Sequence, residues 1–136
     1  MRLNNTSKYA IRILSYIANN NQQLHNAKEL SETLDIPYKF LTKIMTELTK
    51  SNFIISTRGR EGGYTLSRPT DEITIMDVLQ NFNDIIYQKD CLLGIGKCDG
   101  SNKCGLHDQW VKPKKLIKKM FENTTLNDFK GSNFKI

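Results

Sequence analysis

Cysteines and long apolar runs are scarce in this chain, and it does not begin with a leader-like segment. No apolar run approaches the roughly 20 residues of a membrane span, and the start MRLNNTSKYA has no apolar signal core. The three cysteines are an odd number, which gives no disulfide framework. We therefore expect a cytoplasmic protein whose cysteines serve metal or redox chemistry.

The charges of the chain are unequal. Twenty Lys and Arg residues stand against fourteen Asp and Glu residues, a formal net charge of +6 in a chain of 136 residues. This excess favours an anionic partner, with nucleic acid as the first candidate, although a basic surface without a partner has the same composition. The length suits one domain built around one core.

The first part of the chain predicts three helices. Residues 8–18 carry apolar side chains at helical spacing, Asn26 can cap a second helix, and Pro37 suits the first turn of a third. His25 has no partner in the sequence, so we expect it at the surface. The third helix, over 37–50, directs one apolar stripe inward: Phe40, Leu41, Ile44, Met45 and Leu48.

The spacing of apolar residues changes from a helical to a strand-like pattern after the third helix. The runs 53–57 and 64–67 are β-branched and aromatic and flank RGREGG, which predicts a hairpin with a glycine-rich tip. Thr74 and Asp77 have capping-box spacing at the start of another helix, and apolar residues recur over 106–121. This order predicts a mainly α fold with a small β-hairpin, namely a winged helix-turn-helix domain followed by a long C-terminal helix.

The third helix and the hairpin carry the candidate DNA contacts. Outward side chains near the start of the helix can reach base edges in the major groove, whereas Lys50 suits a phosphate. Arginines at a glycine-rich tip suit a narrow minor groove or phosphates. A solvated helix face and a turn kept for solubility are the alternatives. The candidates are Tyr38, Lys39, Thr42, Lys43, Lys50, Arg58, Arg60 and, at the start of the first helix, Arg2.

All three cysteines lie in one segment, CLLGIGKCDGSNKCGLH, with the spacing C-x6-C-x5-C-x2-H. A zinc knuckle has a tighter pair, and the ferredoxin pattern C-x2-C-x2-C is absent. Such loose spacing suits ligands wrapped around an iron–sulfur cluster. The candidate ligands are therefore Cys91, Cys98 and Cys104, with His107 as the fourth. The alternatives are a zinc site, a thiol switch, an iron–sulfur electron carrier, or three unrelated cysteines in a loop.

Taken together, these motifs resemble bacterial winged-helix iron–sulfur regulators of the IscR and NsrR kind. The resemblance runs in order over about residues 1–128, and its specific part is a wing followed by three cysteines. The segments that carry it are MRLNNTSKYAIRIL, PYKFLTKIMTELTKSNFI, STRGREGGYTLSRP, ITIMDVL and the tail C…C…CGLHDQW.

The resemblance implies a homodimeric transcription factor, not an enzyme, which binds palindromic operators and is joined through the helix after the cysteine loop. It implies that the three cysteines hold a cluster that senses iron–sulfur status, redox state or nitric oxide. In IscR-like members a histidine just after the third cysteine completes a 2Fe–2S site, and His107 has that place. In nitric-oxide sensors the fourth ligand is an aspartate from the partner's first helix, where this chain has Lys8. A 2Fe–2S cluster is favoured, with 4Fe–4S as the alternative.

We therefore expect two functional parts. Residues 1–82 form the DNA-binding domain, and residues 83–136 form the cluster loop and the dimerisation helix. Pro113 interrupts this last helix, and a proline inside a helix costs about 3 kcal/mol. We expect a bend at Pro113, or a helix that begins near it.

Overall fold

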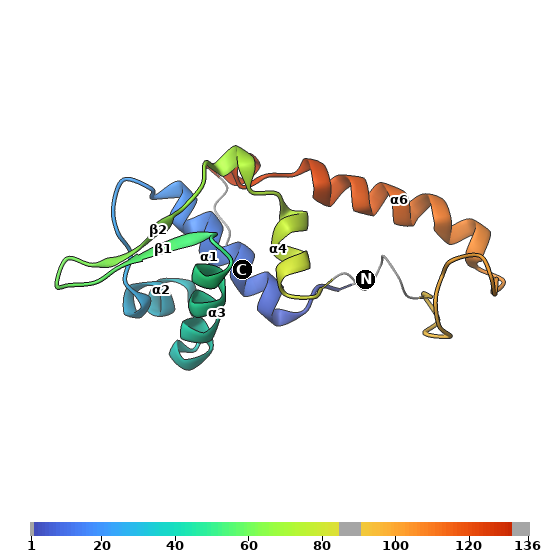
Figure 1. Ribbon diagram of the computed structural model, residues 1–136, viewed down its shortest axis with the longest axis horizontal. Coiled ribbons are helices and arrows are strands. Elements are labelled where there is room, and N and C mark those ends of the chain that lie inside the picture. Colours follow the sequence, from blue (N-terminus) through green and yellow to red (C-terminus); the bar gives the residue numbers. More distant parts are fainter. Residues whose placement is uncertain (1, 85–90, 132–136) are drawn as a thin grey trace.

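A computed structural model describes residues 2–84 and 91–131 of the chain. A helical body carries a two-stranded hairpin on one side and a long, projecting helix on the other (Figure 1). No helix in the described ranges is long and apolar enough to cross a membrane. The elements are α1 (Asn5–Asn19), α2 (Ala27–Leu34), α3 (Tyr38–Lys50), β1 (Ile54–Thr57), β2 (Gly63–Leu66), η1 (Thr70–Glu72), α4 (Ile75–Asn81), α6 (His107–Asn123) and η2 (Leu126–Phe129).

Side-chain caps fix where α2 and α4 begin. The Asn26 side chain accepts a hydrogen bond from the Glu29 amide at 2.8 Å, which starts α2 at the predicted place. At the start of α4 the Thr74 amide donates to Asp77 Oδ2 at 2.9 Å, and the Asp77 amide donates to Thr74 Oγ1 at 3.1 Å. The capping box predicted from the sequence is therefore confirmed.

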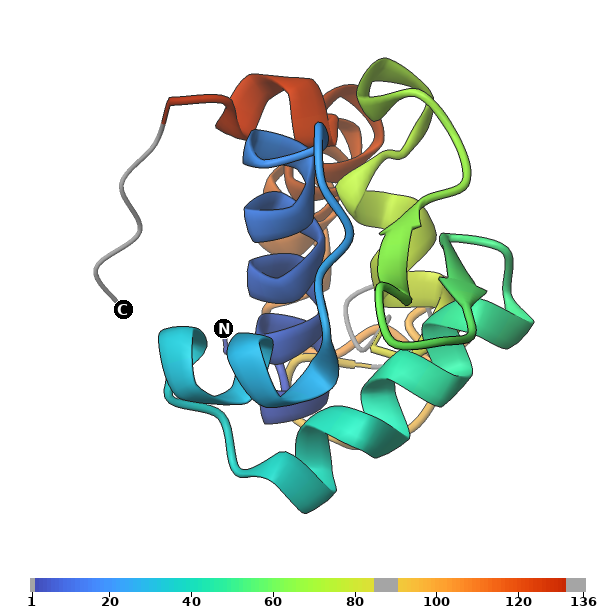
Figure 2. The ribbon, with the colours of Figure 1, turned by 90° about the vertical axis from the view of Figure 1, so that its left-hand side faces the viewer.

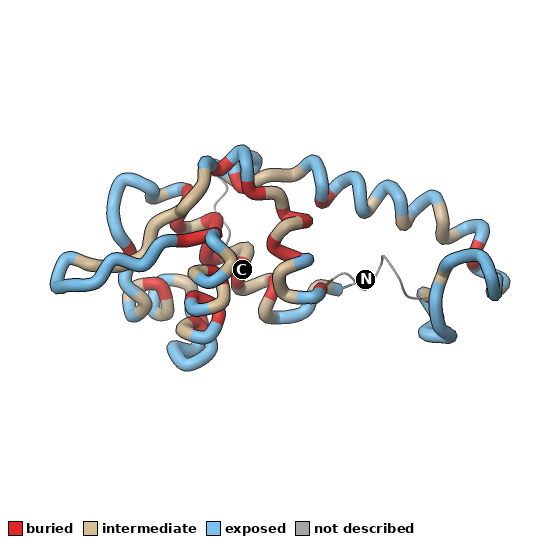
Figure 3. The backbone as a smooth tube through the Cα atoms, in the orientation of Figure 1, coloured by how far each residue is buried: buried red, intermediate tan, exposed pale blue. Residues whose placement is uncertain are grey.

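The core lies among α1, α3 and α4, and α1 contacts both of the others in the body of the molecule (Figure 2). Most buried residues lie in this body, whereas the hairpin tip and most of α6 are exposed; His107, at the start of α6, is buried outside the body (Figure 3). The last turn of α6 and the start of η2 return to the body, because Phe121 and Leu126 belong to the same core as α1. The C-terminal end of α6 is thereby fixed to the helices that carry the hairpin.

The inward face of α3 was predicted correctly except at one position. Leu41, Ile44, Met45 and Leu48 are at most 2% exposed, but Phe40 is 42% exposed. A helix turns by about 100° per residue, so Phe40 lies roughly 90° from the centre of this apolar stripe. Its ring instead meets the edge of the Tyr9 ring, with the centroids 5.8 Å apart.

The hairpin is antiparallel, with Ile54 opposite Leu66 and Thr57 opposite Gly63. Its second strand also pairs with the connection between α1 and α2. The His25 amide donates to the Tyr64 carbonyl at 3.1 Å, and the Tyr64 amide donates to the His25 carbonyl at 2.8 Å. His25 is 0% exposed, so its predicted surface position is wrong. It is buried because β2, from a distant part of the sequence, packs over it.

α6 continues through Pro113. It begins at His107, six residues before the proline, rather than near it. Proline has no amide hydrogen, so the Gln109 carbonyl loses its helical partner. Both residues are exposed, which lets water satisfy that carbonyl. The division predicted at residues 82 and 83 lies just before residues 85–90, which are outside the described ranges, and it stays a prediction.

Candidate DNA-binding surface and cysteine loop

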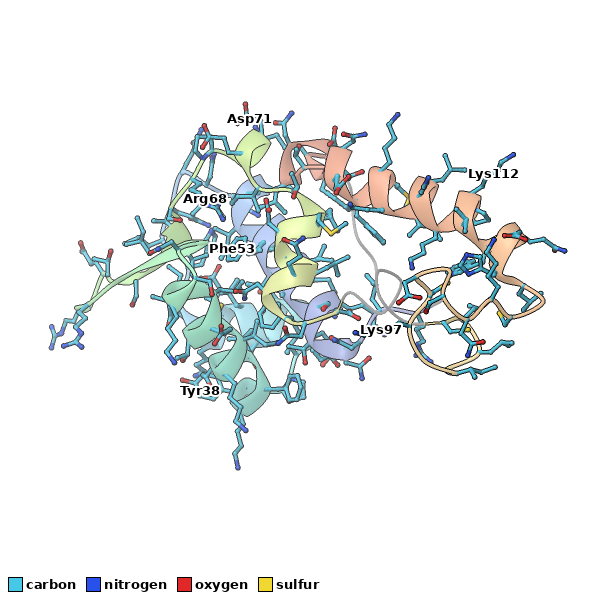
Figure 4. The ribbon with its side chains drawn as sticks, turned by 45° about the vertical axis from the view of Figure 1, so that its right-hand side comes forward. Tyr38, Phe53, Arg68, Asp71, Lys97 and Lys112 are labelled. Carbon is cyan, nitrogen blue, oxygen red and sulfur yellow. The ribbon has the colours of Figure 1, made fainter. Side chains whose placement is uncertain are left out.

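The α3 residues that are predicted to contact DNA lie on the exposed side of the helix. The short turn at Asp35, with φ 50° and ψ 50°, ends α2 and lets α3 start at Tyr38. Tyr38 is 56% exposed and projects from the first turn of α3 (Figure 4). Lys39, Lys43 and Lys50 are exposed and Thr42 is half-buried. The helix therefore presents polar and basic side chains to solvent while its other face is in the core.

The hairpin tip is fully exposed and projects away from the helices (Figure 1). Gly59 has φ 118°, a conformation that favours glycine, and a Cβ atom built there would meet nothing within 4 Å. Within the described residues neither Arg58 nor Arg60 has a carboxylate within ion-pair distance. Two guanidinium groups are thus available for an external anion.

Arg2 is exposed and precedes the first residue of α1 by three positions. The start of α1 lies beside α3, because Thr6 lines the same small pocket as Phe40 and Lys43. The structure therefore brings the α3 candidates and the hairpin arginines into one part of the molecule, and the DNA contact of Arg2 stays a prediction.

The cysteine loop lies at the N-terminal end of α6, at the far end of the molecule from the hairpin (Figure 1). Its four candidate ligands approach one another as two pairs. Cys91 Sγ lies 3.8 Å from Cys104 Sγ, and Cys98 Sγ lies 3.4 Å from His107 Nδ1. The three cysteines are half-buried free thiols, and His107 is 9% exposed. Within the described ranges, no three His, Cys, Asp or Glu side chains gather as they would around a single metal ion.

Tight turns around Cys91 shape its chemistry. Its amide donates to the Gly96 carbonyl, and the Gly94 amide donates to the Cys91 carbonyl, each at 2.8 Å. This folds the chain back so that backbone amides, those of Leu93 and Ile95 above all, surround the sulfur. Their hydrogen bonds lower the pKa of the Cys91 thiol below its ordinary value. The loop therefore stabilises the Cys91 thiolate relative to that of an ordinary cysteine, and the thiolate is the form that binds metals.

The geometry combines a basic winged-helix surface with a separate cysteine loop. A family model described as Rrf2, iron-dependent transcriptional regulator, matches residues 3–131. The chain belongs to the Rrf2 family. Members of this family are transcriptional regulators rather than enzymes, so the protein is a DNA-binding regulator of transcription.

Named relatives agree with the Rrf2 assignment. The chain is 33% identical to the transcriptional regulator NsrR of Oceanobacillus iheyensis, over 94% of this chain and 88% of the relative. It is 29% identical to IscR of Sodalis glossinidius, over 93% of this chain and 76% of the relative. Among solved structures, CymR, the global cysteine regulator of Bacillus subtilis, superposes with a TM-score of 0.80 at 20% identity, over 94% of this chain and 95% of that chain. This last similarity confirms the predicted fold.

Sequence reasoning missed two features of this Rrf2 protein. The contact of His25 with the wing, as we now call the hairpin of residues 54–66, carries no local signal, because β2 comes from far along the chain. The pairing of the four candidate ligands was also missed, because spacing predicts only that the cysteines meet. The glycines of the loop were the available hint that it turns tightly enough to do so.

Proposed function

We propose that an iron–sulfur cluster held by Cys91, Cys98, Cys104 and His107 controls the DNA binding of this Rrf2 regulator. The observation that carries the proposal is the arrangement of these side chains in two close pairs. The iron-dependent description of the family and the likeness to NsrR and IscR support it. A regulator of chromosomal genes would act in the cytoplasm, which is where we place it.

The two distances fit two metal ions better than one. Two thiolates on one tetrahedral metal, each about 2.3 Å from it, lie about 3.8 Å apart, and a thiolate and an imidazole nitrogen lie about 3.5 Å apart. The pairs here are separated by 3.8 and 3.4 Å. In a 2Fe–2S cluster each iron takes two protein ligands, whereas in a 4Fe–4S cluster each takes one. The pairing therefore favours 2Fe–2S, and it disfavours a single zinc ion, which would draw all four ligands together.

The cluster would supply a centre that changes charge or is lost in response to redox state, iron supply or nitric oxide. The chain's own part is to transmit that change. His107 is the first residue of α6, and its amide donates to the Cys104 carbonyl at 3.0 Å. Phe121, near the other end of α6, is packed in the core. A shift of the loop would therefore move a helix that is fixed to the DNA-binding body.

Protein purified without oxygen is expected to contain about 2 iron and 2 sulfide ions per chain and to absorb visible light. Removing the cluster is expected to change the affinity for an operator, selected from a random duplex pool, by about 5- to 150-fold, the usual range of coupling between two sites. Iron and sulfide assays and fluorescence anisotropy on the same preparation provide the measurement. A colourless protein with one zinc ion per chain would contradict the proposal.

A thiol switch is the second candidate, and one specific observation favours it. Cys91 has a lowered pKa, and its sulfur lies 3.8 Å from that of Cys104. Hydrogen peroxide could oxidise this pair to a disulfide: each thiol loses one hydrogen, an S–S bond forms, the O–O bond breaks and two water molecules are released. If iron-free protein responds to peroxide with a loss of two mass units and a change in DNA affinity, this candidate replaces the cluster.

We also propose that two copies associate through α6. Leu116 and Met120 are 67% and 51% exposed on one side of this projecting helix. The same side continues into an apolar cavity of about 330 Å³ between α1 and α6, where Met120, Ile11 and Leu3 lie in the wall. A second copy supplies an identical apolar stripe, and a twofold axis matches a palindromic operator with half-sites about 34–36 Å apart.

Leu116→Glu is expected to convert the dimer to a monomer, because a carboxylate at the centre of an apolar interface would be buried without a partner. Light scattering at micromolar concentration should give about 31 kDa for the wild type, twice the 15.7 kDa of one chain, and 15.7 kDa for the variant. Lys115→Glu, on another face of the same helix, is the control and should remain dimeric. If light scattering gives the same mass for both variants, the proposed α6 interface is wrong.

A further inference from the structure

The wing is anchored only at its base, where Ile54 is buried and Tyr64 and Leu66 pack against the core. Three of the four residues of β1 are exposed, all of β2 is half-buried, and the tip lies in solvent. The orientation of the tip must therefore be set at the base of the wing. The main-chain pairing of His25 with Tyr64 extends the two-stranded sheet by one bridge along the edge of β2, and it fixes that base to the connection between α1 and α2.

The buried His25 ring fastens this connection to two helices. Its Nε2 donates to the Asn20 carbonyl, at the end of α1, at 2.8 Å. Its Nδ1 faces the Glu29 carboxylate of α2 at 3.3 Å, and the edge of the ring meets Tyr16 with the centroids 5.4 Å apart. His25 therefore joins α1 and α2 through its side chain and β2 through its backbone.

The approach of β2 to His25 depends on a glycine. A Cβ atom built on Gly63 would lie 2.8 Å from the His25 carbonyl oxygen, which is closer than real Cβ contacts. The main chains can therefore meet here only because residue 63 has no side chain. The contact is a built feature of the wing rather than an accident of packing.

The end of α1 that receives the His25 ring also contacts the segment after α6. Asn19 Nδ2 donates to the Phe129 carbonyl at 3.4 Å, and the Gly131 amide donates to Asn19 Oδ1 at 3.2 Å. The wing is thus connected through His25 and the end of α1 to the C-terminal segment that continues from α6.

We propose that His25 is a positioning residue for DNA binding: without touching the duplex, it holds the wing at the angle from which Arg58 and Arg60 reach the DNA. The inference rests on the DNA contacts that the sequence predicts for these arginines. It predicts that the effect of His25 on affinity passes through them.

The test is a double-mutant cycle. His25→Leu replaces the imidazole with an apolar side chain of similar size, which leaves the Asn20 carbonyl without its donor. This variant is expected to bind the operator about tenfold more weakly. His25→Gln, whose amide nitrogen can take the place of Nε2, should stay within about threefold of the wild type. In an Arg58→Ala/Arg60→Ala background, His25→Leu should change affinity less than about twofold, because the wing contact is already lost.

Two outcomes would overturn the proposal. If His25→Leu weakens binding equally in both backgrounds, His25 acts on the whole fold and not through the wing. If the Tyr64 amide of the wild-type protein exchanges its hydrogen as fast as the amides of the exposed tip, the contact with His25 does not hold the wing. This second measurement needs no variant, so it stands even if His25→Leu fails to fold. If Arg58→Ala/Arg60→Ala alone has no effect, the assigned DNA contact fails instead.

Discussion

The double variant Arg58→Ala/Arg60→Ala is expected to bind its operator at least about 100-fold more weakly than the wild type. Each hydrogen bond from a charged group contributes about 1.5–3 kcal/mol, and a dimer would lose such contacts at two wings. Both side chains are exposed and form no ion pair within the described residues, so their removal should leave the free energy of unfolding within about 0.5 kcal/mol of the wild type. The loss would therefore belong to binding and not to folding.

Salt dependence gives the same prediction a second measurement. If a dimer neutralises six to ten phosphates, the logarithm of its binding constant should fall with the logarithm of the salt concentration at a slope of about −5 to −9. Removing two arginines per chain should make that slope shallower by about 2 to 4. Fluorescence anisotropy titrations at several potassium chloride concentrations measure both the affinity and the slope.

The matched control removes the same charge from another place. Lys112→Ala/Lys115→Ala also takes two positive charges from each chain, and Lys112 projects on the side of the molecule away from Tyr38 (Figure 4). This control should bind the operator within about threefold of the wild type. If both double variants lose affinity equally, net charge rather than the wing determines binding.

The sequence predicted the features of the fold that depend on neighbours along the chain. The Asn26 cap, the capping box of Thr74 with Asp77, and the glycine-rich tip all depend on residues a few positions apart, so their patterns can be read locally. His25 could not be placed in this way. Its amide and carbonyl pair with Tyr64, and a histidine in a helix connection has no local signal for such a distant partner.

The sequence likewise predicted only part of the candidate site. Clustered cysteines predict that their sulfurs meet, because a loop of this length can bring them together. Which sulfur meets which depends on turns set by hydrogen bonds, such as that of the Cys91 amide to the Gly96 carbonyl. α6 was also predicted only in part. Its apolar residues predicted a helix, but whether water could satisfy the carbonyl freed by Pro113 depends on exposure, which spacing does not give.

Cys98→Ala is expected to abolish the cluster, with iron falling from about 2 to below about 0.2 per chain and the visible absorption disappearing. In the proposed site Cys98 and His107, 3.4 Å apart, would hold one iron together, so this substitution would leave that iron with a single protein ligand. His107→Cys should behave differently. A thiolate can replace the imidazole, so the iron content should stay near 2 while the reduction potential falls by on the order of 100 mV, because a neutral imidazole raises the potential relative to a thiolate.

The exposed carboxylate beside His107 supplies the control for this ligand assignment. Asp108 lies 3.2 Å from Lys103 Nζ, turned toward solvent, so Asp108→Asn should keep both the iron and the potential of the wild type. If Asp108→Asn shifts the potential and His107→Cys does not, the fourth ligand is the carboxylate and the pairing of Cys98 with His107 is wrong. If Cys98→Ala keeps two irons per chain, the cluster does not use the ligands that the two pairs define. Anaerobic iron assays and a redox titration of all three variants separate these outcomes, because each changes a different combination of iron content and potential.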